Sequence, residues 1–454
     1  MPQEVTITNF YCVSPVENGG QRRIFFLARE LARAYNVRLI TVSREMQFRS
    51  IRLAPSLTEI QVPADDEYRH AESLINRRVK MAGDLSYTHH WAKCITYQKV
   101  LHQALKTSAA AITAHPYSIY AIEAALGSRN TPIIYDSQNV ELRQKKELLA
   151  PWPRDYQAII DVERQCLHRC AKVVACAESD IEAFGEDYGI PAHRCALVPN
   201  GADVINAPRL TEEERVASRA RLGLKDRFVC VFAGSYHFPN LRAVERIVEF
   251  ARCASECLFV VFGGVSEYLT ELGSLPPNVL GLGVINEAQK WQILGCCDLA
   301  LNPMERGSGS NIKMFEFAAA KLPILSTPFG ARGSRFRAGS DFVAAEIEEF
   351  ADHIRRLRKS DAREWTCFGE NAYQTAAEHY DWTVIGAKYA DVVRKAIARQ
   401  EDEPRCQADG PHDGQDAVLF MRLADGRRKP LLRAAAARAT EPWKGPACDS
   451  DGLP

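Results

Sequence analysis

The sequence has no apolar run of about 20 residues, the length that a helix needs to cross a bilayer. It also has no excess charge, since 57 basic residues balance 57 acidic ones and the formal net charge is zero. Nucleic-acid-binding proteins usually carry a basic excess, so no nucleic acid is expected as a partner. The N-terminus lacks the basic-then-apolar pattern of a signal peptide. These absences favour a cytoplasmic protein, and the oligomeric state stays open.

The sequence also lacks the cysteine and aspartate spacings that are typical of metal sites. The chain contains 14 cysteines. The closest pairs along the chain are Cys166/Cys170, Cys253/Cys257 and Cys296/Cys297. None has the C-x-x-C spacing of a zinc knuckle, and several lie in apolar runs, which is typical of reduced, buried thiols. No D-x-D motif stands at the end of an expected strand. We therefore expect no metal site and no bound cofactor.

Short apolar runs alternate with amphipathic helical patterns along most of the chain. In the first half the runs include VTITNFYCVS, VRLITVS, AAAITAHP, PIIYDSQN and KVVACA. The series restarts at residue 228 with FVCVFAG, CLFVVFGG, VLGLGVI, LALNPM and LPILST. Strands that alternate with helices predict parallel sheets covered on both faces, in an α/β fold.

Domain boundaries follow from this pattern and from a polar seam at residues 206–227. Residues 1–205 are predicted to form one Rossmann-like domain and residues 206–380 a second, with a cleft between the carboxyl ends of their strands. Residues 381–400 read as a helix. Residues 401–454 are rich in Pro, Gly, Ala and mixed charge, which predicts a mostly disordered tail with one short helix around 431–439.

One glycine-rich turn combines open backbone with a cation and a carboxylate. Residues 306–317 read RGSGSNIKMFEF, and the expected helix begins near Ser310 or Asn311. A helix start attracts anions such as phosphate. Lys313 could neutralise a diphosphate, while Glu316 could accept hydrogen bonds from the hydroxyls of a ribose. The residues alone leave open a solvated helix with an i,i+3 ion pair. The Walker loop and the G-x-G-x-x-G motif are both absent.

The continuation LNPMERGSGSNIKMFEFAAAKLPILSTPFGARG resembles the donor site of GT-B fold glycosyltransferases of the retaining family-4 type. Further stretches resemble other parts of that family in the right order. They are SPVENGGQRRIFFLARELA, TAHPYSIYAIEAA, IIYDSQNVELRQKK, VVACAESDIEAF, LVPNGADV, VFAGSYHFPNLRAVERIVEFA and, at the helix that crosses back to the first domain, HYDWTVIGAKYADVVRKAIARQ. The resemblance covers about residues 5 to 395 and implies a GT-B fold.

The resemblance also implies roles for individual residues. Glu316 would hold the nucleotide ribose, Lys313 would face the diphosphate, and His115 would contact the donor sugar; these three are the expected catalytic residues. For the two glycines after the first strand an ordinary turn stays open, and for His115 a structural role. The remaining expected donor-binding residues are Gly19, Gly20, Gly234, Ser235, Ser308, Gly309, Ser310 and Asn311.

The chain departs from the family pattern in its charges. Ser308 stands where many members carry a further glutamate. Ser235 and Asn240 stand where many relatives place an arginine and a lysine against the departing diphosphate. Lys313, helped by Arg332, would then carry more of the leaving-group stabilisation. Asn139 and Glu141, at the end of an expected strand, are further candidates for lining the cleft.

The implied function is transfer of a sugar from a UDP- or GDP-linked donor to an acceptor hydroxyl with retention, independent of metal. A glycan or a lipid-linked intermediate of polysaccharide or glycoconjugate biosynthesis is the expected acceptor, and peripheral membrane contact stays open. Two alternatives are a non-catalytic protein that binds sugar nucleotides and a sugar-nucleotide epimerase. Binding without turnover would mark the first, and interconversion of the donor without an acceptor the second.

Overall fold

The computed structural model describes residues 2–79, 83–307, 311–402, 420–422 and 428–430. Residues Met1–Glu403 form one compact unit and Pro404–Pro454 another. In the second unit the described residues form an antiparallel pair, β15 (Phe420–Arg422) and β16 (Arg428–Pro430). The helix expected around 431–439 lies outside the described residues. Within the described ranges, no helix combines the length and the apolar character needed to cross a membrane.

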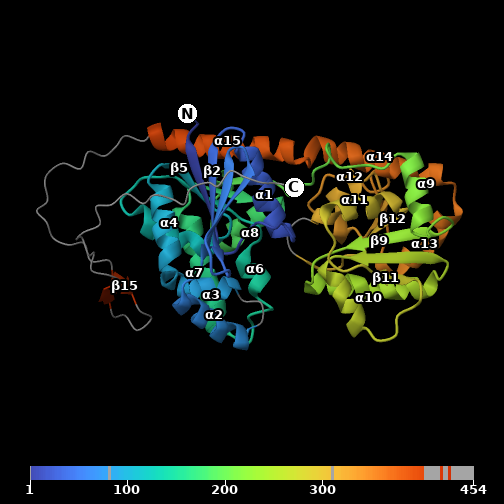
Figure 1. Cartoon of the computed structure of the whole chain (residues 1–454), viewed down its shortest axis with the longest axis horizontal. Helices are drawn as coiled ribbons and strands as arrows, with labels where there is room; N and C mark the ends of the chain where they lie inside the picture. Colours follow the sequence, from blue (N-terminus) through green and yellow to red (C-terminus); the bar gives the residue numbers. More distant parts are fainter. Residues whose placement is uncertain (1, 80–82, 308–310, 403–419, 423–427, 431–454) are drawn as a thin grey trace, which may run out of the picture. The chain divides into compact units, whose positions relative to one another are not determined.

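The first half of the larger unit is built on an eight-stranded sheet with the order β3-β4-β2-β1-β5-β6-β7-β8. Figure 1 labels β2 and β5 of this sheet. All neighbours are parallel except β3 and β4. The strands are β1 (Glu4–Asn9), β2 (Asn36–Ser43), β3 (Arg49–Ala54), β4 (Leu57–Pro63), β5 (Ser108–Thr113), β6 (Ile133–Asp136), β7 (Lys172–Ala175) and β8 (Cys195–Leu197).

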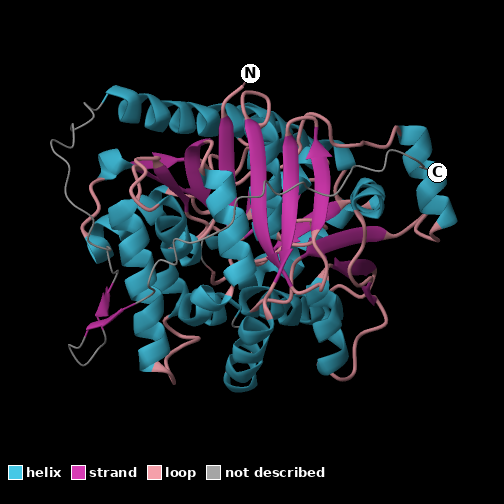
Figure 2. Cartoon of the chain, turned by 60° about the vertical axis from the view of Figure 1, so that its left-hand side comes forward, coloured by secondary structure: helices cyan, strands magenta, loops and turns pink. Residues whose placement is uncertain are grey.

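Helices surround this sheet (Figure 2). They are α1 (Gly19–Leu31), α2 (Asp66–Arg78), α3 (Gly83–His90), α4 (Ile95–Leu105), α5 (Ile119–Leu126), α6 (Glu141–Lys145), α7 (Pro153–Arg169) and α8 (Glu178–Tyr188). The central strands are buried on both faces; β1, for example, is buried from Val5 to Asn9. A parallel sheet covered on both sides explains why its strands read as continuous apolar runs.

The second half repeats the plan with a six-stranded, fully parallel sheet of order β11-β10-β9-β12-β13-β14. Its strands are β9 (Phe228–Ala233), β10 (Cys257–Phe262), β11 (Val279–Gly281), β12 (Leu299–Asn302), β13 (Ile324–Ser326) and β14 (Val343–Ala344). Its helices are α9 (Glu212–Arg221), α10 (Phe238–Cys253), α11 (Glu287–Cys296), α12 (Ile312–Ala319), α13 (Phe350–Lys359) and α14 (Ala362–His379).

The chain crosses between the two halves twice, near residue 205 and near residue 380, and hydrogen bonds join the two crossing segments. Ala202 donates its amide to Tyr380 O and accepts from Trp382 N, at 3.0 and 3.2 Å. The buried carboxylate of Asp381 accepts from Val204 N and Ile205 N, both at 2.9 Å. After this point α15 (Trp382–Asp402) packs along α1 of the first half.

Candidate functional site

Lys313 and Glu316, which follow the glycine-rich turn, lie on one helix, α12, as predicted. They take different partners. Lys313 Nζ donates to Asn240 Oδ1 at 2.8 Å and lies 4.7 Å from the centre of the Phe232 ring. Glu316 is 14% exposed and binds elsewhere. Within the described residues no ion pair joins the two side chains, so the alternative of a solvated i,i+3 pair is wrong.

Glu316 is the centre of a cluster of charges. Its Oε1 lies 2.8 Å from Lys290 Nζ on α11 and 3.3 Å from Arg22 Nη1 on α1. Glu287 bonds the same two cations, at 2.6 Å and 2.7 Å. Burial acts to raise the pKa of Glu316, but Lys290 and Arg22 outweigh it and hold the pKa below its ordinary value. The carboxylate therefore stays ionised, the form that accepts hydrogen bonds from hydroxyl groups.

Lys313 has the opposite electrostatic setting. Burial lowers the pKa of its ammonium group to about 7, against the opposing effect of Glu316 and with a further contribution from Arg332. Part of the side chain reaches solvent. The surroundings of Lys313 thus favour the neutral amine. An anion bound beside it would raise its pKa and favour the charged ammonium form.

The turn between β9 and α10 faces Lys313. A Cβ on Gly234 would lie 2.9 Å from Asn240 Cγ, and Asn240 Nδ2 donates to Ser235 O at 3.0 Å. Burial lowers the pKa of His237 in the same turn, and Lys145 and Lys313 lower it further. The structure therefore brings Gly234, Ser235 and Asn240 together with Lys313.

Only part of the glycine-rich turn itself is described. Ser308, Gly309 and Ser310 lie outside the described residues. Gly307 has φ of +139°, a region that favours glycine, and a Cβ there would lie 3.5 Å from Arg332 Nη2. Asn311 precedes α12, and its Nδ2 donates to Asn302 Oδ1 at 2.6 Å and to Gly330 O at 3.3 Å. Its side chain thus holds the helix start against the end of β12, rather than standing free for a ligand.

Gly19 and Gly20, the two glycines predicted to bind the donor, lie close to other side chains. A Cβ on Gly19 would lie 3.1 Å from Ile312 Cδ1, at the start of α12. A Cβ on Gly20 would lie 2.8 Å from Gln138 Oε1 and 2.9 Å from Tyr11 Oη. These first two residues of α1 thus lie between the start of α12 and the segments that follow β1 and β6.

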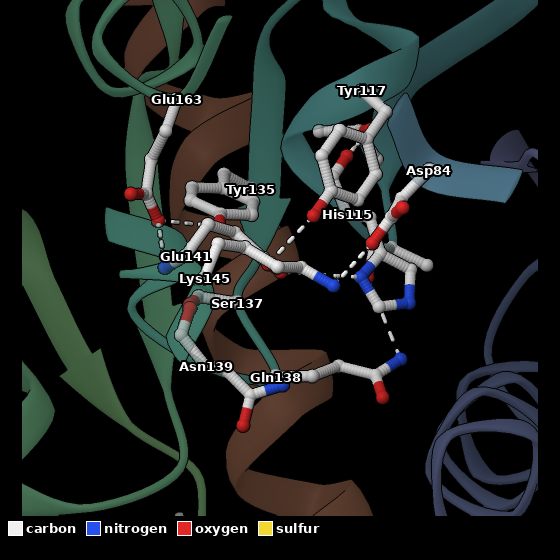
Figure 3. Close-up of polar contacts among 12 residues, drawn as sticks. Asp84, His115, Tyr117, Tyr135, Ser137, Gln138, Asn139, Glu141, Lys145 and Glu163 are labelled. Atoms are coloured by element: carbon white, nitrogen blue, oxygen red, sulfur yellow. Dashed lines mark hydrogen bonds and ion pairs between the residues drawn. The ribbon is translucent and has the colours of Figure 1, made fainter. Parts of the chain in front are cut away.

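His115 follows β5 and is surrounded by polar and aromatic side chains (Figure 3). Its Nε2 lies 3.1 Å from Tyr11 Oη, and its Nδ1 lies 3.7 Å from Glu141 Oε1. The imidazole is 11% exposed and Glu141 only 2%. The prediction that Glu141 lines the cleft is therefore wrong, because its side chain is buried behind His115. Asn139 is half-buried.

Several residues of the site were not among those predicted from the sequence. Tyr11, Gln138, Arg22 and Lys290 contact predicted site residues, yet none belongs to a motif that names its partner. Arg22 offered one hint, because it lies two residues after the glycine pair. Within the described residues, no group of three or more His, Cys, Asp or Glu side chains gathers as a metal site would require.

Comparisons with known proteins agree with this two-part plan. The family model described as Glycosyltransferase Family 4 matches residues 17–205, and that described as Glycosyl transferases group 1 matches residues 227–360. The phosphatidyl-myo-inositol mannosyltransferase of Mycobacterium leprae (strain TN) is 24% identical over 217 residues. That alignment covers 46% of this chain and 54% of the relative, so the chain matches about half of the relative's length.

Two solved structures are similar over most of this chain. Sucrose-phosphate synthase from Thermosynechococcus elongatus has a TM-score of 0.69 at 14% identity, covering 87% of this chain and 100% of that one. HepE from Anabaena, solved in complex with UDP-glucose, has a TM-score of 0.65 at 13% identity, covering 86% and 99%. At these identities the likeness shows the fold, which confirms the predicted GT-B architecture. With family matches on both of its halves, the chain belongs to the family-4, group-1 type of GT-B glycosyltransferases.

Proposed function

We propose that this chain transfers a sugar from a nucleoside-diphosphate sugar to an acceptor hydroxyl, with retention of the anomeric configuration. The carrying observation is the pair on α12. Lys313 faces the turn after β9, and Glu316 is held ionised one turn further on, at the carboxyl edge of the second sheet. Ligands of open parallel sheets bind at that edge. UDP and GDP are the proposed nucleotides, and the UDP-glucose bound to HepE supports UDP.

Each charge has a role in this proposal. Glu316 accepts hydrogen bonds from the ribose hydroxyls after exchanging part of its contact with Lys290 and Arg22. Lys313 stabilises the negative charge that develops on the departing diphosphate, and Arg332 beside Gly307 adds to it in place of a metal. In this mechanism the acceptor hydroxyl attacks on the face that the diphosphate leaves, so no protein nucleophile takes part.

The acceptor is proposed to bind to the first half, where His115, Gly19 and Gly20 lie. The Mycobacterium leprae relative is named for phosphatidyl-myo-inositol, which supports a lipid-linked or glycan acceptor. Among the residues that the structure describes, no pattern selects one sugar. We assign the protein to the biosynthesis of polysaccharides or glycoconjugates, at the cytoplasmic face of a membrane or in the cytoplasm.

The test is a thermal-shift titration with UDP, GDP, ADP and their sugar conjugates. A ligand at about 100 times its Kd stabilises the folded state by about 2.7 kcal/mol, which is readily measured as a rise in Tm. We expect one nucleotide series to stabilise the wild type, and Lys313→Ala and Glu316→Ala to lose the shift. Turnover is then measured as release of the free nucleoside diphosphate.

Matched controls are Lys359→Ala and Glu348→Ala, which remove exposed charges from the same half. Both should keep the full shift. A wild type that responds to no nucleotide would contradict the donor assignment. Binding without nucleotide release in the presence of candidate acceptors would favour the non-catalytic alternative, in which Ser235 and Asn240 reflect lost catalysis.

A further inference from the structure

Glu141 is a buried carboxylate that the proposed donor site does not use. It is the first residue of α6, directly after the loop that follows β6, and it is 2% exposed. Tyr117 Oη donates to its Oε2 at 2.6 Å, and its Oε1 faces His115 Nδ1 at 3.7 Å (Figure 3). A charged group with so little contact with water needs specific partners, and the imidazole faces the carboxylate oxygen that Tyr117 does not bind.

The contacts of His115 select one tautomer. Burial raises the pKa of Tyr11, so the phenol keeps its proton. The Tyr11 O–H is therefore available to Nε2, 3.1 Å away. A nitrogen that accepts a hydrogen bond carries no proton, so the proton of the neutral ring lies on Nδ1. Nδ1 is buried, and among the described residues it has no hydrogen-bond partner, so the charge of Glu141 is what favours this proton.

Other contacts fix the two partners in place. The Tyr117 ring stacks on the imidazole at 5.8 Å, and Phe10 meets it edge-on at 5.4 Å. Glu163 accepts from Glu141 N and Leu142 N, at 2.9 and 3.0 Å, and so holds the start of α6. Burial acts to raise the pKa of Glu141, but His115, Lys145 and Tyr117 outweigh it, and the carboxylate stays ionised.

We propose that Glu141 is a positioning residue that holds His115 in the Nδ1-protonated tautomer, with the Nε2 lone pair turned toward Tyr11. Because Nδ1 is buried, the exposed 11% of the imidazole belongs to its other atoms. A hydroxyl group of the sugar substrate would then donate to Nε2 in place of Tyr11. The substrate part of this inference rests on the proposed function; the tautomer does not.

The experiment reads the tautomer directly in the ligand-free protein. The full chain is labelled with ¹⁵N-histidine, two-bond ¹H–¹⁵N correlations are recorded, and the His115 signals are those lost in His115→Gln. We expect the wild type to carry its proton on Nδ1. Glu141→Asp keeps the negative charge and should keep the tautomer, whereas Glu141→Leu should shift the ring toward the Nε2-protonated form.

Kinetics separate positioning from structure. Glu141→Leu should lower kcat roughly tenfold or more, as loss of a correctly protonated group does, with the Kd for nucleoside diphosphate unchanged. Glu141→Asp, which keeps the charge, should recover most of the activity. An Nε2-protonated wild type, or a Glu141→Leu protein with an unchanged tautomer, would overturn the inference, and the wild-type spectrum decides even if the leucine variant does not fold. Failure of nucleotide binding with the expected tautomer would instead count against the proposed function alone.

Discussion

At the scale of single residues, Lys313 should change its charge near neutral pH. Burial brings its pKa to about 7, and a diphosphate beside it favours the charged form. We therefore expect nucleotide binding at pH 8 to take up close to one proton, and the affinity to fall as the pH rises above about 7. Calorimetric titration in two buffers of different ionisation enthalpy measures this uptake. The second phosphate pKa, about 6, lies too low to contribute at pH 8.

Lys313→Arg is the control for this prediction, because arginine stays charged throughout the range. Its nucleotide affinity should be nearly independent of pH, with no proton uptake. The same pKa affects stability: between about 7 and 10.5 the unfolded chain binds the Lys313 proton more than the folded chain does, so this residue's contribution to the free energy of unfolding rises with pH. A wild type that binds nucleotide without proton uptake would contradict a lowered pKa.

Residues of the site differ in how far the sequence predicts them. Lys313 and Glu316 were predictable because they share a helix that follows a glycine turn, a pattern local to a dozen residues. Lys290 was not, since it lies 26 residues before Glu316 and resembles any charged residue of a helix. The sequence correctly placed Glu141 after the end of a strand. It could not give the direction of the side chain, which depends on the hydrogen bond from Tyr117 and on the bond between Glu141 N and the Glu163 carboxylate.

At the scale of elements, the contact of α15 with α1 depends on a missing side chain. A Cβ on Gly386, within α15, would lie 2.2 Å from Glu30 Cβ on α1. The Cβ atom of Glu30 is bonded directly to the backbone, so a side-chain rotation cannot relieve this contact, and one of the two helices would have to move. We expect Gly386→Ala to lower the free energy of unfolding by about 1–3 kcal/mol, the usual cost of overpacking, as measured by denaturant titration.

Gly185→Ala is the matched control, since Gly185 is also within a helix, α8, but has no atom closer than 3.7 Å to its Cβ position. There the better helix propensity of alanine should raise the free energy of unfolding by about 0.5–1 kcal/mol. Equal effects of the two substitutions would show that helix propensity, and not the approach of α15 to α1, decides the outcome.

The strands were largely predictable, because each strand of a parallel sheet that is buried on both faces consists mostly of consecutive apolar residues. The runs VTITNFYCVS and FVCVFAG became β1 and β9. The run VLGLGVI was longer than its strand, since β11 spans only Val279–Gly281 at the edge of its sheet, where Leu280 is exposed. Apolar residues in a sequence thus mark the centre of a sheet better than its edges.

At the scale of the whole molecule, one apolar cluster includes residues of both halves. Leu27 of α1, Phe315 of α12 and Trp382 of α15 belong to it. Trp382 is 1% exposed and stacks on Phe26 with ring centres 5.1 Å apart and planes 6° from parallel. Because α15 follows the second half in the chain and packs on α1 of the first, we expect the stability of α1 to depend on the packing of this indole.

We therefore expect Trp382→Ala to speed amide hydrogen exchange in α15 and also in α1, by roughly tenfold for every 1.4 kcal/mol of local stability lost. Trp365→Ala is the comparison. Trp365 is also buried, but it belongs to a cluster within the second half. Both substitutions remove an indole and should cost about 3–5 kcal/mol. Exchange measured by mass spectrometry should rise in α1 for the first variant and stay unchanged there for the second. An unchanged α1 in Trp382→Ala would mean that the halves are coupled by the charges around Arg22 and Glu316 rather than by α15.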